Sequence, residues 1–505
     1  MDLEPSSADP GRAEPTASLQ PRGTDGGAGP AAGGSFRREL GLFDFTLLVI
    51  GAIVGADVYV VAGLGAQSLG SAQLVSWIAA GILAAFIGLA FVQCAAICSS
   101  VGGSYAYAHE AFGPLAGFTA GWALYLGECI ALPIFPIAFA NYLDYFVPVH
   151  SGVGAVTAKL AVVAGVTTIN FFGARAGSRL NDVLTLTKLV PLVLLIVAAV
   201  GLIFLHPGQA SGHLTPFVPL GWGGFGAATV VIFWAYAGFE LSVLPSGEVR
   251  SPAKTLPRGL IIGMAVATVF YLLTALAVSV ALPWQTVAAS SRPLADGLEA
   301  ILKALRLPGG WSAGFMSAGA IISIVGVYDV FTLGLSRLSY ALAADGLFPP
   351  PFARVNARFG TPWFGLAFQA LVAGAAALLF DLSGLIASSV FFLGVCYVIT
   401  SLAALRLVAR SPQQALHVPG LRVALGLAAI SGFYLATQVS PPLIAFGIAA
   451  MAAGLLAYGI RRKAWLAASA EVRSEEQRFE RWVRRGNRWL LRFVRRRHRL
   501  EHDPR

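Results

Sequence analysis

Five ionisable side chains stand inside otherwise apolar runs of this chain and are the first candidates for chemistry. They are Asp57, Glu128, Lys188, Glu240 and Asp329. Burying a charge without a partner is costly, so each of these residues predicts either a partner or a function.

The residue patterns of common enzyme and metal sites are missing from the sequence. We find no nucleophile–base pair, no phosphate-binding loop and no cluster with metal-ligand spacing, so we expect a protein that is not an enzyme and uses no cofactor. Cys94 and Cys98 share a helix face at a spacing of four, but no further ligands follow them. All four cysteines lie in apolar runs, which favours buried free thiols.

The composition predicts a membrane protein. Of the 505 residues, 56% are hydrophobic and only 12% are charged, whereas soluble domains carry about 25% charged residues. Apolar runs of roughly 20 residues, long enough to cross the hydrocarbon as helices, recur along the chain. A membrane β-barrel would instead need segments of about 10 residues with alternating polarity. The expected fold is therefore an all-α polytopic membrane protein.

Three regions follow from this pattern. Residues 1–36 are rich in Gly, Pro, Ala and Ser and are expected to form a disordered cytoplasmic N-terminus. Residues 39–460 form the predicted transmembrane domain, and 461–505 a basic amphipathic cytoplasmic tail. About twelve spans are predicted, at 41–66, 72–98, 118–147, 152–172, 182–205, 222–245, 258–282, 312–342, 363–380, 384–408, 419–437 and 441–460.

Charge placement predicts the orientation. Lys and Arg gather before the first span and in nearly every second loop after it, so both termini are expected in the cytoplasm of a cell (inner or plasma) membrane. The tail from Arg461 onward holds 15 Lys and Arg against 6 Asp and Glu. Its interleaved apolar residues suggest a helix lying on anionic lipids, with a solvated basic tail as the alternative. Nearly all of the net positive charge lies there, so no nucleic-acid partner is implied.

The first and sixth spans contain small residues where a membrane helix is expected to be regular. Gly51 and Gly55 precede Asp57 in the first span, and Gly238 interrupts the sixth. Unwound backbone is tolerated in a membrane only where protein or a water-filled cavity receives its polar groups. A matched pair of interrupted spans indicates an inverted-repeat transporter with a midplane site. The alternative is that these glycines only permit close helix packing.

Several separate motifs resemble the amino acid–polyamine–organocation transporter superfamily, over essentially all of Glu39 to Tyr458. The motifs are Gly51-Ala52-Ile53-Val54-Gly55-Ala56-Asp57-Val58-Tyr59, Gly102-Gly103-Ser104-Tyr105-Ala106-Tyr107, Ala235-Tyr236-Ala237-Gly238-Phe239-Glu240, Gly247-Glu248-Val249-Arg250-Ser251-Pro252 and Ser336-Arg337-Leu338. Their order along the chain matches the family, which makes the resemblance specific.

The resemblance implies a LeuT-like 5+5 inverted repeat plus two extra helices, working by alternating access. The substrate would lie between the broken first and sixth spans, with its carboxylate on backbone amides and its amine on carbonyls. Carried onto this chain, the substrate-binding residues are Ile53, Gly55, Ala56, Asp57, Phe233, Ala235, Tyr236 and Gly238. Aromatic residues at the sixth break would serve as a gate.

Asp57 departs from the family pattern, which usually has glycine at this position. A carboxylate there would oppose a substrate carboxylate and attract an ammonium, and Glu128 in the third span adds to that effect. An amine, polyamine or cationic amino acid is then a possible substrate. Asp57 could instead bind a proton, or be neutralised by Lys188 or by the exposed amides.

Lys188, near the start of the fifth span, resembles a lysine that proton-coupled and exchanging relatives carry where sodium-coupled relatives bind a cation. The alternative is a lysine that extends to the membrane surface. Glu128, Glu240 and Asp329 are further candidates for coupling or gating.

The sequence thus predicts a secondary transporter of a small solute. The main hypothesis is a permease for amino acids, coupled to protons or working by exchange. Its alternatives are an amine, polyamine or cationic amino acid transporter in which Asp57 binds the ammonium, and a transporter-like sensor. A channel would need a selectivity filter or rings of charge, which we do not find.

Overall fold

A computed structural model describes residues 40–98, 102–149, 151–172, 177–242, 249–356, 359–460 and 462–464. These residues are helical apart from turns, loops and one isolated bridge between Leu40 and Val249. The predicted terminal region 1–36 and nearly all of 461–505 lie outside the described residues.

The helices follow one another along the chain with short connections. Their bounds are α1 Leu42–Ile53, α2 Ala56–Leu69, α3 Gln73–Ile97, α4 Ser104–Phe112, α5 Pro114–Ala131, α6 Ile134–Leu143, α7 Gly152–Phe172, α8 Gly177–Leu205, α9 Pro207–His213, α10 Phe225–Phe233, α11 Phe239–Ser242, α12 Pro252–Ala281, α13 Trp284–Ala289, α14 Pro293–Ala304, α15 Ser312–Ala344, α16 Trp363–Leu379, α17 Leu382–Arg410, α18 Leu421–Thr437 and a last helix Pro441–Ile460. Short 3₁₀ turns lie at η1 Gly70–Ala72, η2 Trp234–Tyr236 and η4 Pro350–Ala353.

Each of the twelve predicted spans coincides with helix in the described chain. Among the described residues, nine helical stretches are long and apolar enough to cross a membrane, and the first of them, Leu42–Ile97, contains two predicted spans. The remaining two predicted spans are the shorter apolar helices α16 and α18. The all-α polytopic fold is confirmed, whereas the number of crossings stays a prediction.

Burial separates central spans from peripheral ones. The most apolar windows of Pro114–Leu143 and Phe225–Ser242 are 78% and 83% buried, whereas those of Gly152–Phe172 and Pro441–Ile460 are both 22% buried. The third and sixth spans therefore lie inside the bundle, and the fourth and twelfth on its outside.

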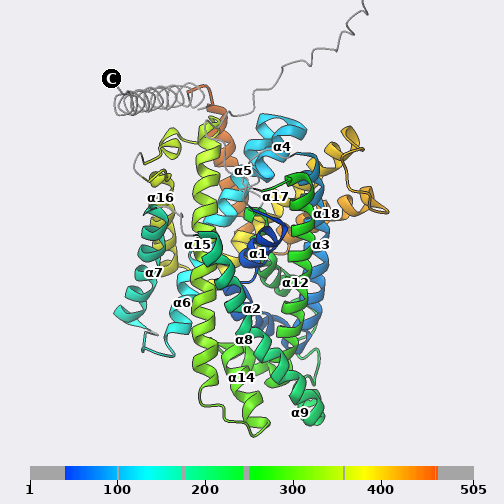
Figure 1. The fold of residues 1–505 in the computed structure, drawn as a ribbon, viewed down its shortest axis with the longest axis vertical. Helices are drawn as coiled ribbons and strands as arrows, with labels where there is room; N and C mark the ends of the chain where they lie inside the picture. The colour runs from blue at the N-terminus through cyan, green and yellow to red at the C-terminus, as the bar shows by residue number, and fades with distance from the viewer. Residues whose placement is uncertain are drawn as a thin grey trace, which may run out of the picture. The chain divides into compact units, whose positions relative to one another are not determined.

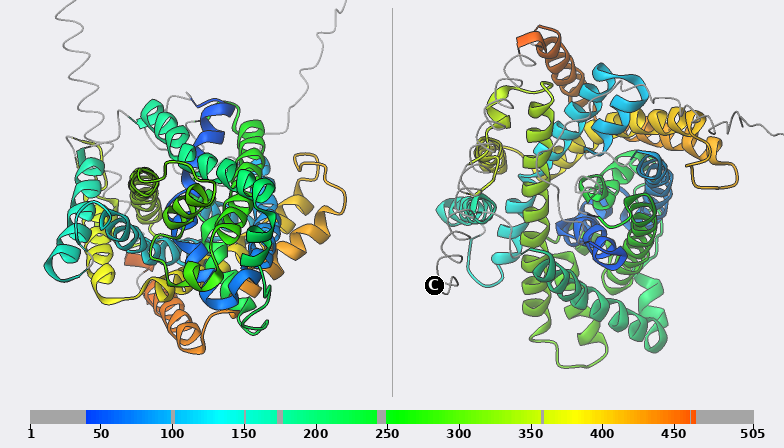
Figure 2. Two further views of the ribbon diagram at one scale, coloured as in Figure 1. Left: turned by 90° about the horizontal axis from the view of Figure 1, so that it is seen from below. Right: turned by 45° about the horizontal axis from the view of Figure 1, so that its top comes forward.

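The first span also lies inside the bundle. Helix α1 packs against α12, α8, α11 and α15, and Figure 1 shows it between α15 and α12. The tilted view in Figure 2 shows α1 and α2, in dark blue, surrounded by other helices. Both interrupted spans are thus covered by other helices.

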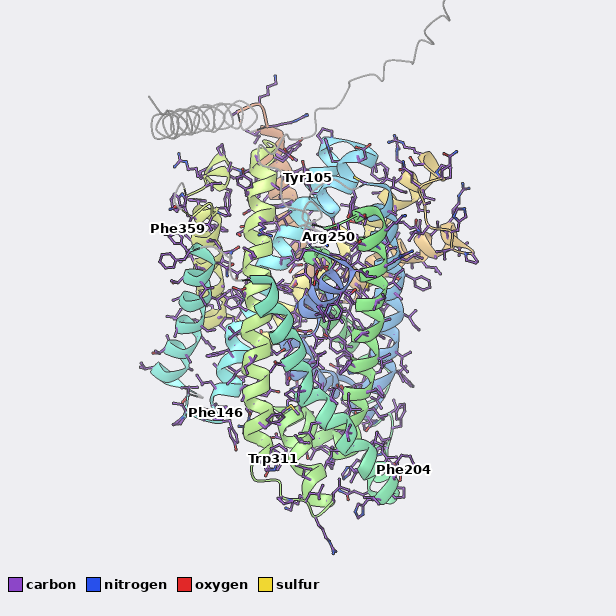
Figure 3. The ribbon with its side chains drawn as sticks, in the orientation of Figure 1. Tyr105, Phe146, Phe204, Arg250, Trp311 and Phe359 are labelled. Atoms are coloured by element: carbon purple, nitrogen blue, oxygen red, sulfur yellow. The ribbon has the colours of Figure 1, made fainter. Side chains whose placement is uncertain are left out.

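The two ends of the bundle carry different residues. Tyr105 and Arg250 lie toward one end in Figure 3, whereas Phe146, Phe204 and Trp311 lie toward the other. Phe204 is 79% exposed. Arg250, which precedes α12, and Trp311, which precedes α15, thus lie at opposite ends of the bundle.

Helices α17 and α18 cross at two glycines. A Cβ atom placed on Gly394 would lie 2.7 Å from the carbonyl oxygen of Gly432, and one placed on Gly432 would lie 2.8 Å from that of Gly394. Small residues at such crossings let two membrane helices approach closely. No larger residue fits there without separating the helices.

We expect Gly432→Ala to destabilise the protein by about 1–3 kcal/mol, because a methyl group must force two backbones apart. Thermal unfolding in detergent measures this as a lowered Tm. Gly426→Ala is the matched control on α18, where an added Cβ meets nothing within 4 Å. Equal Tm values for the two variants would contradict the prediction.

Candidate functional site

The first span breaks after α1. The helix ends at Ile53, Val54 is extended (φ −76°, ψ 101°) and Gly55 lies outside helical space (φ −144°, ψ −139°), before α2 begins at Ala56. A helix end leaves its last carbonyl groups without partners from the helix itself. Because this end is buried among apolar side chains, other groups must bind these carbonyls.

Three of the four end carbonyls of α1 have identified donors. The Val54 amide donates to the carbonyl of Ile50 at 2.8 Å, which is the last helical bond. The ammonium of Lys188, from α8, donates to Gly51 at 2.7 Å. The hydroxyl of Tyr271, from α12, lies 2.8 Å from the carbonyl oxygen of Ile53. Two side chains from neighbouring helices therefore hold the broken end.

The sixth span breaks next to the break in the first span. Helix α10 tightens into η2 and the chain then extends at Ala237 (ψ 162°). Gly238 has φ +108°, a left-handed conformation that side chains disfavour. A Cβ atom placed on Gly238 would lie 2.5 Å from the carbonyl oxygen of Ala52. Gly238 thus permits the two breaks to touch.

Tyr271 joins both breaks to Asp57. Its hydroxyl oxygen lies 2.8 Å from the Ile53 carbonyl, 2.8 Å from the Ala235 carbonyl and 2.7 Å from Oδ2 of Asp57. A tyrosine hydroxyl has one hydrogen to donate, so three acceptors cannot all receive it. A protonated Asp57 would supply a second hydrogen by donating to the Tyr271 oxygen. The hydrogen count therefore favours an Asp57 that carries a proton.

The Asp57 carboxyl also turns back toward the start of α2. A Cβ atom placed on Gly55 would lie 2.9 Å from Oδ1 of Asp57, and the amides of Gly55 and Asp57 are among the groups that act on this carboxyl. Lys188 acts on it electrostatically, but its ammonium is bound to Gly51. Asp57 and Lys188 are each 4% exposed.

Aromatic rings surround this centre. Tyr271 packs on Trp77 of α3 at 5.6 Å and on Tyr236 at 5.2 Å between ring centroids. Phe233, at the end of α10, contacts Tyr236 at 6.5 Å. The Tyr236 hydroxyl donates to the carbonyl of Trp77 at 3.3 Å. All four rings are buried, so the predicted substrate-binding residues are closed off from solvent in this conformation.

The other acidic candidates lie apart from Asp57. Glu240 accepts hydrogen bonds from the Gly238 amide and the Tyr397 hydroxyl, and Glu128 faces Glu240. Asp329 of α15 accepts a hydrogen bond from Asn170 of α7 at 2.6 Å. Glu128 therefore pairs with Glu240 rather than joining Asp57 in one acidic site, and Asp329 binds the outer helix α7.

Some residues of the predicted site are not described in full. Ala56 begins α2, but the placement of its side chain lies outside the described residues, as does the whole of Glu248. Within the described ranges, no group of three or more His, Cys, Asp or Glu side chains could hold a metal ion.

Tyr271 is a site residue that the sequence analysis missed. Its signal was a single hydroxyl in the apolar stretch Val269–Leu273. A buried tyrosine hydroxyl usually finds a hydrogen-bond partner, so a tyrosine in mid-span predicts a polar neighbour. The sequence could not show that this neighbour would be the two breaks.

Comparisons with known proteins show which sequences this chain resembles. The family model described as "Amino acid permease" matches residues 40–457. The chain is 28% identical over 427 residues to the branched-chain amino acid permease BcaP of Bacillus subtilis, which covers 79% of this chain and 88% of that relative.

Two further relatives carry other names. The methylthioribose transporter of Bacillus subtilis is 30% identical over 355 residues, 67% of this chain and 74% of the relative. Cationic amino acid transporter 4 of Homo sapiens is 30% identical over 397 residues, 75% of this chain and 61% of the relative. Relatives of this chain thus differ in the solutes for which they are named.

We expect Tyr271→Phe to lower both stability and solute uptake, because it removes the hydroxyl that contacts both breaks and Asp57. A net hydrogen bond contributes about 0.5–1.5 kcal/mol, and unpaired buried acceptors add to the loss. Thermal unfolding and uptake into proteoliposomes measure the two effects.

Tyr125→Phe is the control, because the Tyr125 hydroxyl is buried with no hydrogen-bond partner in the described structure. Its removal should leave the Tm unchanged or raised. If both variants behave alike, Tyr271 does not hold the breaks together.

Proposed function

This chain belongs to the amino acid permease family, and from that membership and the geometry of the two breaks we propose that it carries amino acids across the membrane by alternating access. It is a multi-pass membrane protein with a small-molecule substrate. We place that substrate between the broken first and sixth spans and propose that protons, not sodium ions, drive or accompany its movement.

The contact between Lys188 and Gly51 is the observation that carries the proposal. A free carbonyl at the end of a broken membrane helix is a suitable ligand for a metal cation. Here the ammonium of Lys188 already lies 2.7 Å from that oxygen and supplies a positive charge in the same place. An ammonium can also release and rebind a proton when its burial changes.

Asp57 supports coupling to protons. The start of α2 presents amides and a partial positive charge, which favour the carboxylate of an amino acid. An ionised Asp57 beside these amides would repel that carboxylate, whereas a protonated Asp57 would not. Substrate binding and protonation of Asp57 would then favour each other, because each is easier when the other has occurred.

Alternating access follows from the burial of the site. Phe233 and Ala235 are fully buried, and Tyr236 is 1% exposed. A solute can reach them only after helices move on one side or the other. The short helix α11 and the two breaks are the segments that we expect to change most.

A second candidate is transport of amines or cationic amino acids. The observation that favours it is the position of the Asp57 carboxyl over Gly55. A carboxylate of the protein would then take the place of the substrate carboxylate, and the substrate would offer an ammonium instead. One relative, cationic amino acid transporter 4, carries a name that fits this reading.

We also propose a cell-membrane location with both termini in the cytoplasm, and contact of residues 461–505 with anionic lipids. Support comes from the loops that hold Lys and Arg and from the basic tail.

Uptake of amino acids into proteoliposomes should be equal in sodium and choline buffers. Lys188→Met should lower it by about tenfold or more, because a charge-assisted hydrogen bond contributes about 1.5–3 kcal/mol. Lys159→Met is the matched control, since the Lys159 ammonium also donates to a carbonyl, that of Ala377, but between α7 and α16. A sodium requirement, or equal losses in both variants, would contradict the proposal.

The Asp57→Asn variant distinguishes transport of amino acids from transport of amines or cationic amino acids. If Asp57 must be protonated to admit an amino acid, wild-type uptake falls as the pH rises, whereas the variant keeps its uptake and loses that pH dependence. If Asp57 binds a substrate ammonium, the variant loses uptake of putrescine or arginine at every pH. Labelled alanine, leucine, arginine and putrescine, each measured over a pH series, provide the comparison.

A further inference from the structure

Two buried carboxyl groups face each other beside the sixth break. Glu128 comes from α5 and Glu240 from α11, and they are 1% and 0% exposed. Each carboxyl interacts with the other. Two interacting like charges in an apolar interior strongly oppose each other, so the pair holds at most one negative charge.

The distribution of hydrogen-bond donors favours Glu240 as the charged carboxyl. Glu240 receives the amide of Gly238 at 3.0 Å on Oε2 and the hydroxyl of Tyr397 at 2.8 Å on Oε1. An ionised carboxylate only accepts, and both of its oxygens are bound here. Neither oxygen of Glu128 receives a hydrogen bond from the described protein, although both are buried. A neutral carboxyl can instead donate its own hydrogen to its partner.

We propose that Glu128 is a second proton-binding site, separate from Asp57, and that its proton is shared with Glu240. In the closed conformation the proton stays on Glu128 and is donated to the Glu240 carboxylate. When one side opens, the O–H bond of Glu128 breaks and the proton passes to water on that side. A proton from the other side restores the acid after the opposite opening. This inference rests on the transport function proposed above.

The groups around the Glu128–Glu240 pair link the loss of this proton to the break in the sixth span. The groups that face the pair are Tyr397 and Cys396 of α17 and the amides of Gly238 and Glu240. A phenol and a thiol are neutral at physiological pH, so neither offsets a second negative charge. Loss of the proton therefore forces the carboxylates apart. Glu240 is bound to Gly238, so this separation would pull on the break itself.

The experiment compares exchange with accumulation. Glu128→Gln keeps an N–H donor toward Glu240 but cannot release a proton. Proteoliposomes are loaded with unlabelled amino acid to measure counterflow of labelled amino acid, and are separately given an inward pH gradient of about one unit at zero membrane potential. One proton moved down that gradient supports about tenfold accumulation, which corresponds to about 1.4 kcal/mol.

The expected result is counterflow within about twofold of wild type and accumulation lowered by about tenfold, since one proton fewer moves per cycle. Glu299→Gln makes the same chemical change at an exposed position on α14 and should match wild type in both assays. Glu240→Gln is the second variant, which also leaves only one carboxyl and should also lose accumulation.

Accumulation equal to wild type in a folded Glu128→Gln variant would overturn the inference. Loss of counterflow in both folded variants would overturn it too, because the pair would then serve substrate binding. Failure of the wild-type protein to exchange any amino acid would instead reject the proposed function, and this outcome is distinct from the other two.

Discussion

The central constraint on this structure is that backbone polar groups inside a membrane need partners. Two spans are interrupted, and each interruption frees carbonyls and amides that water cannot reach. Most of the side chains that bind them come from other helices of the bundle. Lys188 binds Gly51, Tyr271 contacts Ile53 and Ala235, and Glu240 binds the amide of Gly238. The irregular spans are thus held by side chains from neighbouring helices and by Glu240 itself.

The same contacts place ionisable groups where charge is hard to keep. Asp57 and Lys188 lie beside the first break, and Glu128 and Glu240 lie beside the sixth. All four are almost fully buried. Each pair is easiest to bury when its total charge is small, so the proton positions that we propose would depend on how the broken helices are arranged.

The sequence was sufficient to predict the helical spans and both breaks, and it singled out Asp57 and Lys188, which lie beside the first break. Length, apolarity and the placement of glycine are properties of single segments, and the sequence of a single segment is enough to determine them. The partners were not predictable in this way. Glu128 could be placed in the third span, but a span that is apolar all round gives no period to show which neighbour it faces. The Glu128–Glu240 contact and the Asp329–Asn170 bond both come from helix packing.

Tyr271 is a second example of a residue whose partners could not be predicted from its own segment. Its position in the seventh span was plain, yet its role depends on three oxygens from three separate segments. Only the folded arrangement brings Ile53, Ala235 and Asp57 to one hydroxyl. When a residue acts by joining several segments, the sequence of its own segment gives little indication of that role.

The shortage of hydrogens at Tyr271 makes this contact locally frustrated. Whichever carbonyl receives its hydrogen, that of Ile53 or that of Ala235, the other is left less well bound. The closed conformation is therefore held less firmly than a fully paired one, and neither broken span is favoured strongly over the other. A carrier that must open to each side in turn benefits from such a balance, since a deep energy minimum in one conformation would slow every cycle.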